Sequence, residues 1–268
     1  MNFLRHYLIA LRFSTRVPVS GTLAQWAGFS PDVLSASAAH FPGVGWLVGI
    51  VACAAFAVLG LALPDSAFTA LAAAVGSTIA TVLLTGGSHE NGLAHTADGL
   101  GGGAAPQRAL EIIADSRLGA FGAIAVALAL LAKVSLLAVL AASSPVAVLV
   151  ALLAGHVLSR FWPLLLVRGM SCVGDAGSTG KGPLAERIGS RNLAIALTWC
   201  VLALLVALVA QGVTFAIFSL TASAMALLYM KRLLARRLQG FTEESLGAAQ
   251  QVCEVAFYFG AAVALAVD

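Results

Sequence analysis

Charged residues are scarce in this sequence. Asp, Glu, Lys and Arg together make up 10% of its 268 residues, whereas hydrophobic residues make up 60%. Water-soluble domains carry roughly a quarter charged residues. A mean hydropathy of +0.96 is incompatible with a surface that faces water throughout, so we expect a polytopic membrane protein without a large soluble domain.

Cysteines and aromatic residues are also few. The four cysteines, Cys53, Cys172, Cys200 and Cys253, show no CxxC or Cys/His spacing, which argues against a zinc site and against a disulfide framework. Walker A, GxGxxG and GxSxG patterns are absent from any credible strand-to-helix context, which argues against P-loop hydrolysis and hydride transfer. The net charge of +3 does not by itself indicate a nucleic-acid partner.

Long apolar runs predict an all-α fold. They consist mainly of Ala, Leu and Val and are about 18–24 residues long, which suits helices that cross ~30 Å of hydrocarbon and is too long for barrel strands. We expect a single membrane domain over residues 1–268, a helical bundle with about seven transmembrane helices and an amphipathic surface helix over residues 1–17. The seven spans are expected at 44–63, 67–86, 118–141, 146–167, 192–211, 213–230 and 250–267.

The basic residues predict the orientation of these spans. Thirteen of the 15 Lys and Arg residues fall in segments on one side of the arrangement, and the other two, Lys133 and Arg160, fall inside spans. By the positive-inside rule the basic segments are cytoplasmic. We therefore expect the N-terminus and the loops 85–117, 168–191 and 231–249 to face the cytoplasm, with 85–117 as the active-site loop.

The longest polar interruption covers residues 84–122. It contains the pattern E-N-x-x-x-H-x-x-D, formed by Glu90, Asn91, His95 and Asp98. Oxygen ligands with one imidazole suit Mg²⁺ or Mn²⁺ better than zinc, and the glycines among them let a phosphate approach closely. We interpret the segment as a divalent-metal and phosphate site at a membrane face, and the alternative is a solvated loop with ordinary polar residues.

Four further polar residues are candidates for the same site. Asp115 could complete the metal shell and Arg117 could clamp a phosphate, or both could only cap the junction with the third span. Lys133 and Arg160 lie within spans, where cations need partners. They either contact a substrate phosphate or form structural pairs, for which Glu254 is the natural counter-ion.

The segment before the last span brings a hydroxyl and two carboxylates together. Thr242, Glu243 and Glu244 lie on the side of the bundle expected to carry the central polar segment. A helix N-cap by Thr242 with glutamates in the first turn explains the same string without catalysis. Both interpretations stay open at this point.

The motifs resemble those of a known family. Residues 85–99 read TGGSHENGLAHTADG and residues 114–122 read ADSRLGAFG. Both are similar, in order and spacing, to the signature of the cobalamin synthases, the adenosylcobinamide-GDP ribazoletransferases: T-G-G/A-x-H-E-D-G-L-A-D-x-x-D-G, then K-D-S-R-x-G-x-x-G. Residues 12–18, 41–45 and 240–247 also look like parts of the family pattern, so the resemblance covers nearly the whole chain.

The resemblance implies a phosphoryl transfer late in cobalamin biosynthesis. The adenosylcobinamide-phosphate moiety of adenosylcobinamide-GDP would pass to α-ribazole or α-ribazole 5′-phosphate, and GMP would leave. Mg²⁺, or alternatively Mn²⁺, would be the cofactor, and the bacterial inner membrane would be the location. Besides these substrates and the lipid bilayer, a second copy of the chain or other late corrinoid-pathway enzymes are open as partners.

The resemblance also implies roles for individual residues at the matching positions of this sequence. The expected catalytic residues are His89, His95 and Asp98, and one of the histidines would take the proton of the ribazole hydroxyl. The expected metal ligands are Glu90, Asn91, Asp98, Asp115 and Glu244. The expected substrate contacts are Arg117, Lys133, Arg160 and Thr242.

This chain departs from the family pattern at several positions. Asn91 and His95 replace aspartates, Ala114 replaces a lysine, and residues 243–244 are Glu-Glu where the family has Gly-Asp. The loss of two carboxylates predicts weaker binding of a hard cation, so a catalytically weakened corrinoid-binding or scaffold paralogue is one alternative. A CDP-alcohol phosphatidyltransferase is another, although its D-G-x-x-A-R pattern is absent. A transporter is the third alternative. It would place its ionisable groups near the middle of the membrane, whereas most of them here are expected in cytoplasmic loops.

Overall fold

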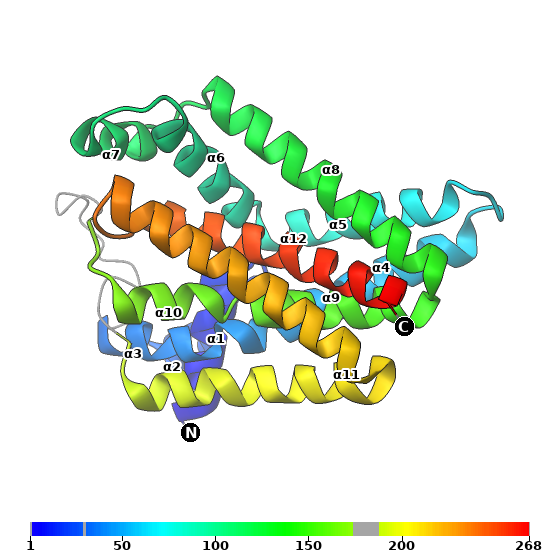
Figure 1. Ribbon diagram of the computed structural model, residues 1–268. Helices are drawn as coiled ribbons and strands as arrows, with labels where there is room; N and C mark the ends of the chain where they lie inside the picture. Colours follow the sequence, from blue (N-terminus) through cyan, green and yellow to red (C-terminus); the bar gives the residue numbers. More distant parts are fainter. Residues whose placement is uncertain (1, 29–30, 174–187, 268) are drawn as a thin grey trace.

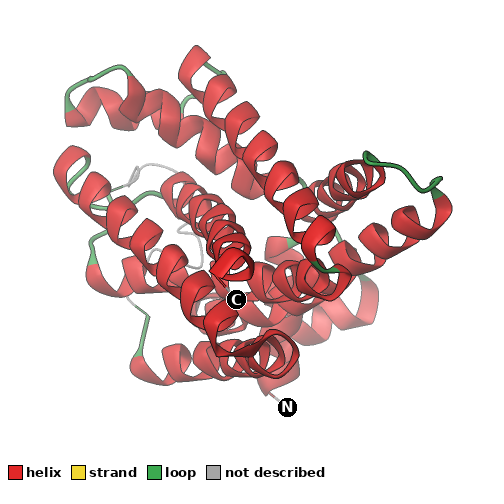
Figure 2. Cartoon of the chain, turned by 45° about the vertical axis from the view of Figure 1, so that its right-hand side comes forward, coloured by secondary structure: helices red, strands yellow, loops and turns green. Residues whose placement is uncertain are grey.

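A computed structural model of the chain describes residues 2–28, 31–173 and 188–267. These residues form α-helices, one 3₁₀ turn and a single parallel β-bridge between Cys172 and Phe241. Figure 2 shows that the described chain is almost entirely helical. The protein is thus an all-α polytopic membrane bundle, as its composition predicts. Helices suit this chain because each backbone N–H and C=O within hydrocarbon must be bonded inside its own segment.

The order of the helices is as follows (Figure 1). The N-terminal part consists of α1 Asn2–Ser14, α2 Gly21–Ala27, α3 Pro31–Ser37 and the 3₁₀ turn η1 Ala38–His40. The central part consists of α4 Phe41–Ala62, α5 Thr69–Thr85, α6 Ser88–Gly101, α7 Pro106–Ala114 and α8 Ala120–Ser143. The C-terminal part consists of α9 Pro145–Ser159, α10 Trp162–Gly169, α11 Ser190–Arg237 and α12 Glu243–Val267.

The expected spans correspond to these helices, although the count of seven is not confirmed. By length and composition five helices of the described chain can cross a membrane, or six if α5 and α6 together form one bent span. The expected turn at Gln211–Gly212 is present, because Gly212 has a non-helical backbone with φ 85°. The two halves of α11 fold back on each other there (Figure 1). Most of the expected loop 168–191 lies outside the described residues.

The central polar segment is helical, which corrects the expectation of a loop over 85–117. Gly86 and Gly87 both have positive φ, 74° and 69°, a backbone conformation that favours glycine. They end α5 and start α6 with a 90° change of direction. The polar motif therefore forms α6, a helix packed against the bundle, and α7 follows it.

Helix α12 lies at the centre of the bundle and packs against α6, α8, α9, α10 and α11, as the two views show (Figures 1 and 2). Small residues let these helices approach closely, as is usual between membrane helices. Fully buried alanines include Ala52, Ala151, Ala203 and Ala261. The central position of α12 is important for the site, because its first turns meet α6 and its middle meets α8 and α9.

Candidate functional site

A cavity of about 230 Å³ opens where the first turns of α6 and α12 meet α1, α4 and the α9–α10 junction. Its polar lining comes from four places. Helix α1 supplies Ser14, helix α6 supplies Ser88, His89 and Asn91, helix α12 supplies Glu243, Glu244 and Gln250, and the α9–α10 junction supplies Arg160. Apolar side chains, including Phe13, Phe41 and Pro163, complete the wall.

Two glycines let α6 and α12 cross with their backbones in contact. A Cβ at position 92 would lie 2.5 Å from the backbone oxygen of Glu244, and a Cβ at position 247 would lie 3.3 Å from the Cα of His89. Any side chain at position 92 would therefore push against backbone and not against a flexible side chain. The close crossing brings Asn91 and Glu244 to the same cavity.

Because α6 and α12 are in backbone contact at Gly92, we expect Gly92→Ala to disrupt their packing. The added methyl group should force α6 and α12 apart, which we expect to cost about 1–3 kcal/mol as overpacking and to lower catalysis about 100-fold through misplaced cavity groups. Gly60→Ala is the matched control, because a Cβ there meets no atom within 4 Å. Thermal unfolding in detergent and the catalytic rate are measured for both variants. Equal stability and equal rates in Gly92→Ala and Gly60→Ala would contradict the prediction.

Arg160 is the cationic group of the cavity. It lies where the fourth expected span breaks between α9 and α10, and only 4% of it is exposed. Its Nη1 donates to the backbone oxygen of His156 at 2.8 Å, and its Nε has no hydrogen-bond partner. A buried guanidinium with unused donors beside a cavity suits an anionic ligand, since such donors match phosphate oxygens.

Oxygen atoms lie on the α6 and α12 walls of the same cavity. They belong to Asn91, Glu243 and Glu244. Asn91 and Glu244 were expected from the sequence as metal ligands and the role of Glu243 was left open, whereas Ser88 and Gln250 were not singled out. A usable signal existed for Gln250, a polar residue inside an expected membrane span, and for Ser88, the first residue of a helix that follows two glycines.

Thr242 serves as a helix cap. Its Oγ1 accepts a hydrogen bond from the backbone N–H of Ser245 at 3.2 Å, and the Ser245 hydroxyl returns a bond to the Thr242 carbonyl at 2.8 Å. This reciprocal pair starts α12, so the capping interpretation is confirmed. Thr242 is not among the residues that line the cavity.

Asp98 bonds to the start of another helix. Its two carboxylate oxygens accept from the backbone N–H groups of Gly119 and Gly122, both at 2.7 Å. A carboxylate in this position satisfies donors that a helix leaves free at its N-terminus and interacts favourably with the helix dipole. Asp98 thereby connects α6 to α8, and it is not among the residues that line the cavity.

Asp115 and Arg117 bind each other on the surface between α7 and α8. The Arg117 Nη2 donates to Asp115 Oδ2 at 2.6 Å, and the Arg117 backbone N–H donates to Oδ1 at 3.0 Å. These hydrogen bonds from the Arg117 side chain and backbone lower the pKa of the Asp115 carboxyl to about 2. The pair matches the alternative of a local cap at the junction with the third span.

The expected metal ligands are not gathered into one cluster. In the described part of the chain, no group of three or more His, Cys, Asp and Glu side chains is arranged to hold a metal ion. The expected convergence of Glu90, Asp98 and Asp115 is therefore corrected, because Asp98 caps α8 and Asp115 faces Arg117. Glu90 Oε1 accepts from Gln251 at 3.1 Å, and its Oε2 is buried without a partner.

The expected histidines differ in their surroundings. His89 lines the cavity, and its Nε2 is buried without a hydrogen-bond partner. His95 lies farther along α6, is 8% exposed and has an unpartnered Nδ1, but it is not among the residues that line the cavity. Of the two, only His89 is placed to meet a ligand in the cavity.

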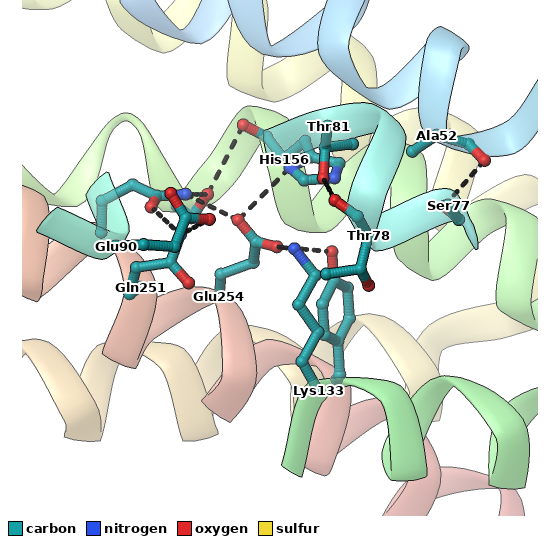
Figure 3. A network of polar contacts seen from close by, with 12 residues as sticks. Ala52, Ser77, Thr78, Thr81, Glu90, Lys133, His156, Gln251 and Glu254 are labelled. Carbon is teal, nitrogen blue, oxygen red and sulfur yellow. Dashed lines mark hydrogen bonds and ion pairs between the residues drawn. The ribbon is translucent and has the colours of Figure 1, made fainter. Parts of the chain in front are cut away.

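Lys133 has the counter-ion expected from the sequence. Its Nζ lies 2.6 Å from Glu254 Oε1, and the two residues are 2% and 1% exposed. The pair joins the middle of α8 to α12 (Figure 3). Lys133 does not line the cavity, so the structure gives it an ion-pair partner inside the protein.

Comparisons with known proteins agree over the full chain. Residues 6–262 match the family described as cobalamin-5-phosphate synthase. Curated relatives named adenosylcobinamide-GDP ribazoletransferase include one from Polaromonas naphthalenivorans, 51% identical and covering 99% of this chain and 100% of the relative. Others are from Leptothrix cholodnii, 42% identical over 96% of this chain and 94% of the relative, and from Shewanella halifaxensis, 38% identical over 94% and 92%. No solved structure matches the chain.

Proposed function

The chain belongs to the cobalamin-5-phosphate synthase family, and from this membership we propose that it catalyses the reaction for which its relatives are named. It transfers the adenosylcobinamide-phosphate moiety of adenosylcobinamide-GDP to α-ribazole, or to α-ribazole 5′-phosphate, and releases GMP. The product is adenosylcobalamin or its phosphate. The single observation that carries the site assignment is the buried Arg160 guanidinium at a cavity lined by carboxylates.

The reaction exchanges one phosphorus–oxygen bond for another. A hydroxyl oxygen of ribazole attacks the phosphorus that carries cobinamide, the bond from this phosphorus to the oxygen of the GMP phosphate breaks, and GMP takes the bonding electrons. The hydroxyl proton passes to a base. Enzymes accelerate such displacements mainly by positioning and by charge stabilisation.

Two residues of the cavity are suited to these tasks. Arg160 donates to oxygens of the diphosphate, where a guanidinium fork gives both charge and direction. His89 takes the hydroxyl proton through its Nε2, because that ring nitrogen has no hydrogen-bond partner in the protein and a neutral imidazole can accept a proton there. In this proposal Arg160 keeps the substrate role expected from the sequence, whereas Lys133, Arg117 and Thr242 act through structure.

A divalent cation fits one part of the cavity. Asn91, Glu243 and Glu244 would hold Mg²⁺ or Mn²⁺, because carboxylate and amide oxygens are the ligands these ions prefer. When bound, the ion would neutralise charge on the diphosphate as GMP leaves. Two carboxylates at the cavity also need such a counter-charge, because Arg160 is the only Lys or Arg among the described residues that line it.

The orientation proposed from the basic loops suits this reaction. A cytoplasmic cavity in a bacterial inner membrane would meet a nucleotide-linked substrate where such compounds are made. The cavity lies at the end of the bundle where α4 and α12 start and where α5 ends. In this proposal the large corrin ring rests on the apolar surface outside the cavity.

Turnover by the purified protein tests the proposed reaction. We expect GMP release from adenosylcobinamide-GDP in detergent or vesicles only when α-ribazole or its phosphate is also present. Formation of a cobamide of the expected mass would confirm the transfer. If the corrinoid binds but GMP is never released, the weakened corrinoid-binding paralogue is the correct alternative.

Metal removal makes a separate prediction. EDTA should abolish GMP release and Mg²⁺ should restore it, and Glu244→Gln should raise the Mg²⁺ concentration for half-maximal activity about 10-fold or more, because a ligand charge is lost. Glu111→Gln is the matched control, since Glu111 is an exposed partner of Arg108 on α7. An unchanged Mg²⁺ dependence in Glu244→Gln would refute this ligand assignment.

The replaced family positions allow a gain-of-function test. Restoring carboxylates in an Asn91→Asp, His95→Asp double variant should strengthen Mg²⁺ binding if the native residues weaken it. Asn91 lines the cavity and His95 does not, so most of the gain should appear in the single Asn91→Asp variant. Activity titrated against Mg²⁺ for the wild type, the Asn91→Asp variant and the double variant measures it.

A further inference from the structure

One carboxylate in the middle of α12 has four polar partners. Glu254 is 1% exposed, and its neighbours come from α8, α9 and α12 itself. Three of them donate to it, Lys133 Nζ at 2.6 Å, Gln250 Nε2 at 2.6 Å and Tyr258 OH at 3.1 Å, and His156 Nδ1 lies 3.3 Å away. A carboxylate with this many partners is held in one orientation, and so are the groups that bind it.

The two oxygens of Glu254 face different groups. Oε1 contacts Lys133 and Tyr258, neither of which lines the cavity. Oε2 contacts Gln250 and His156. Gln250 lines the cavity, and His156 lies one turn before the cavity residue Arg160. Only the Oε2 side of this carboxylate therefore leads toward the cavity. Figure 3 shows Glu254 in contact with both Lys133 and His156.

The contacts of Oε2 continue to both walls of the cavity. On one wall, the same His156 Nδ1 lies 3.4 Å from Arg160 Nη1, which also donates to the backbone oxygen of His156 at 2.8 Å. On the other, Gln250 accepts from Gln251 Nε2 at 3.1 Å, and the same nitrogen donates to Glu90 on α6 at 3.1 Å. Glu90 is the neighbour in sequence of His89 and Asn91, which both line the cavity.

We propose that Glu254 is a positioning residue for the anion site of the cavity. Through His156 it holds the Arg160 guanidinium, and through Gln250 and Gln251 it holds the first turn of α6. It does not touch the substrate. Lys133 balances the charge of Glu254 on the opposite side, so the carboxylate can be buried without weakening the net positive charge that Arg160 offers to a diphosphate. The proposal deepens the proposed function and rests on it for the identity of the anion.

The test measures anion affinity as well as turnover. Inorganic pyrophosphate is titrated into the purified protein by calorimetry, and KM for adenosylcobinamide-GDP and KM for α-ribazole are measured separately. Glu254→Gln should weaken pyrophosphate binding about 10-fold or more and raise KM for adenosylcobinamide-GDP similarly, because the guanidinium is no longer held in place. KM for α-ribazole should change less than twofold.

Two further variants keep the test decisive. Lys133→Met with Glu254→Gln removes both charges together, so it answers the question if the single variant does not fold. Tyr258→Phe is the matched control, since it removes a donor from Oε1 and leaves both contacts of Oε2. It should bind pyrophosphate within twofold of the wild type.

Each outcome decides one claim. Wild-type pyrophosphate affinity in folded Glu254→Gln, or in the double variant, overturns the positioning role. So does an equal loss in Tyr258→Phe, which would indicate general packing, and so does a wild-type protein that binds no pyrophosphate. If the affinities change as expected but the wild type releases no GMP, the proposed reaction fails while the positioning role stands.

Discussion

Replacing Arg160 by methionine is expected to slow GMP release about 100- to 1,000-fold, the loss that typically follows removal of one preorganised charge-stabilising donor. Methionine fills a similar volume, so the wall of the cavity stays packed while the positive charge disappears. The effect should be large because the guanidinium is 4% exposed, and few water molecules can replace its donors. Single-turnover rates of GMP release measure it directly.

Arg108→Met is the matched control for this variant. Arg108 carries the same charge, but its side chain is 67% exposed and it pairs with Glu111 on the surface of α7. Turnover should stay within about twofold of the wild type. Arg160→Lys should fall between the two, because an ammonium keeps the charge and loses the bidentate fork. If Arg160→Met turns over normally, the diphosphate lies elsewhere and the site assignment is wrong.

Lys133→Met should destabilise the folded protein by about 3–5 kcal/mol, because it leaves Glu254 charged and buried without its main counter-ion. An exposed ion pair of similar length should contribute little to stability. Arg108 and Glu111 are 2.7 Å apart and exposed, and such pairs contribute about 0–1 kcal/mol. Unfolding in detergent, followed by circular dichroism for Lys133→Met and Arg108→Met, compares the two environments directly.

Adding Glu254→Gln to Lys133→Met should recover most of the lost stability. The double variant has no unpaired buried charge, and amide groups can still bond to the neighbouring side chains. Recovery in the double variant would show that the cost comes from an uncompensated charge and not from the altered shape at position 133. A double variant less stable than Lys133→Met would contradict this explanation.

The membrane class and most of the helix ends could be predicted from the sequence. Apolar runs long enough to cross a bilayer, interrupted at Pro64, Ser144 and Gly212, correspond to α4, α5, α8, α9 and the two halves of α11. These predictions succeed because a spanning segment must form all its backbone hydrogen bonds within itself, which only a continuous helix allows here. The pairing of Lys133 with Glu254 was predictable for a related reason, since a charge in hydrocarbon needs an opposite charge nearby.

The helicity of residues 88–101 was harder to see. The segment is polar and rich in glycine, which favours loops in isolation. It is helical because α6 packs against α12 and because Gly92 and Gly247 allow the two backbones to touch. That compensation comes from a residue 155 positions away in sequence, and local propensity does not include it.

By itself, then, the sequence determined a bundle of membrane helices and the chemical groups available to it. Periodicity shows which residues share one face of one helix, and hydropathy shows which helices must be buried. Only the tertiary structure decided which of these groups meet, because the groups that line the cavity come from different helices. It paired Asp98 with the start of α8, and it brought Arg160, Asn91 and Glu244 from three helical segments to one cavity.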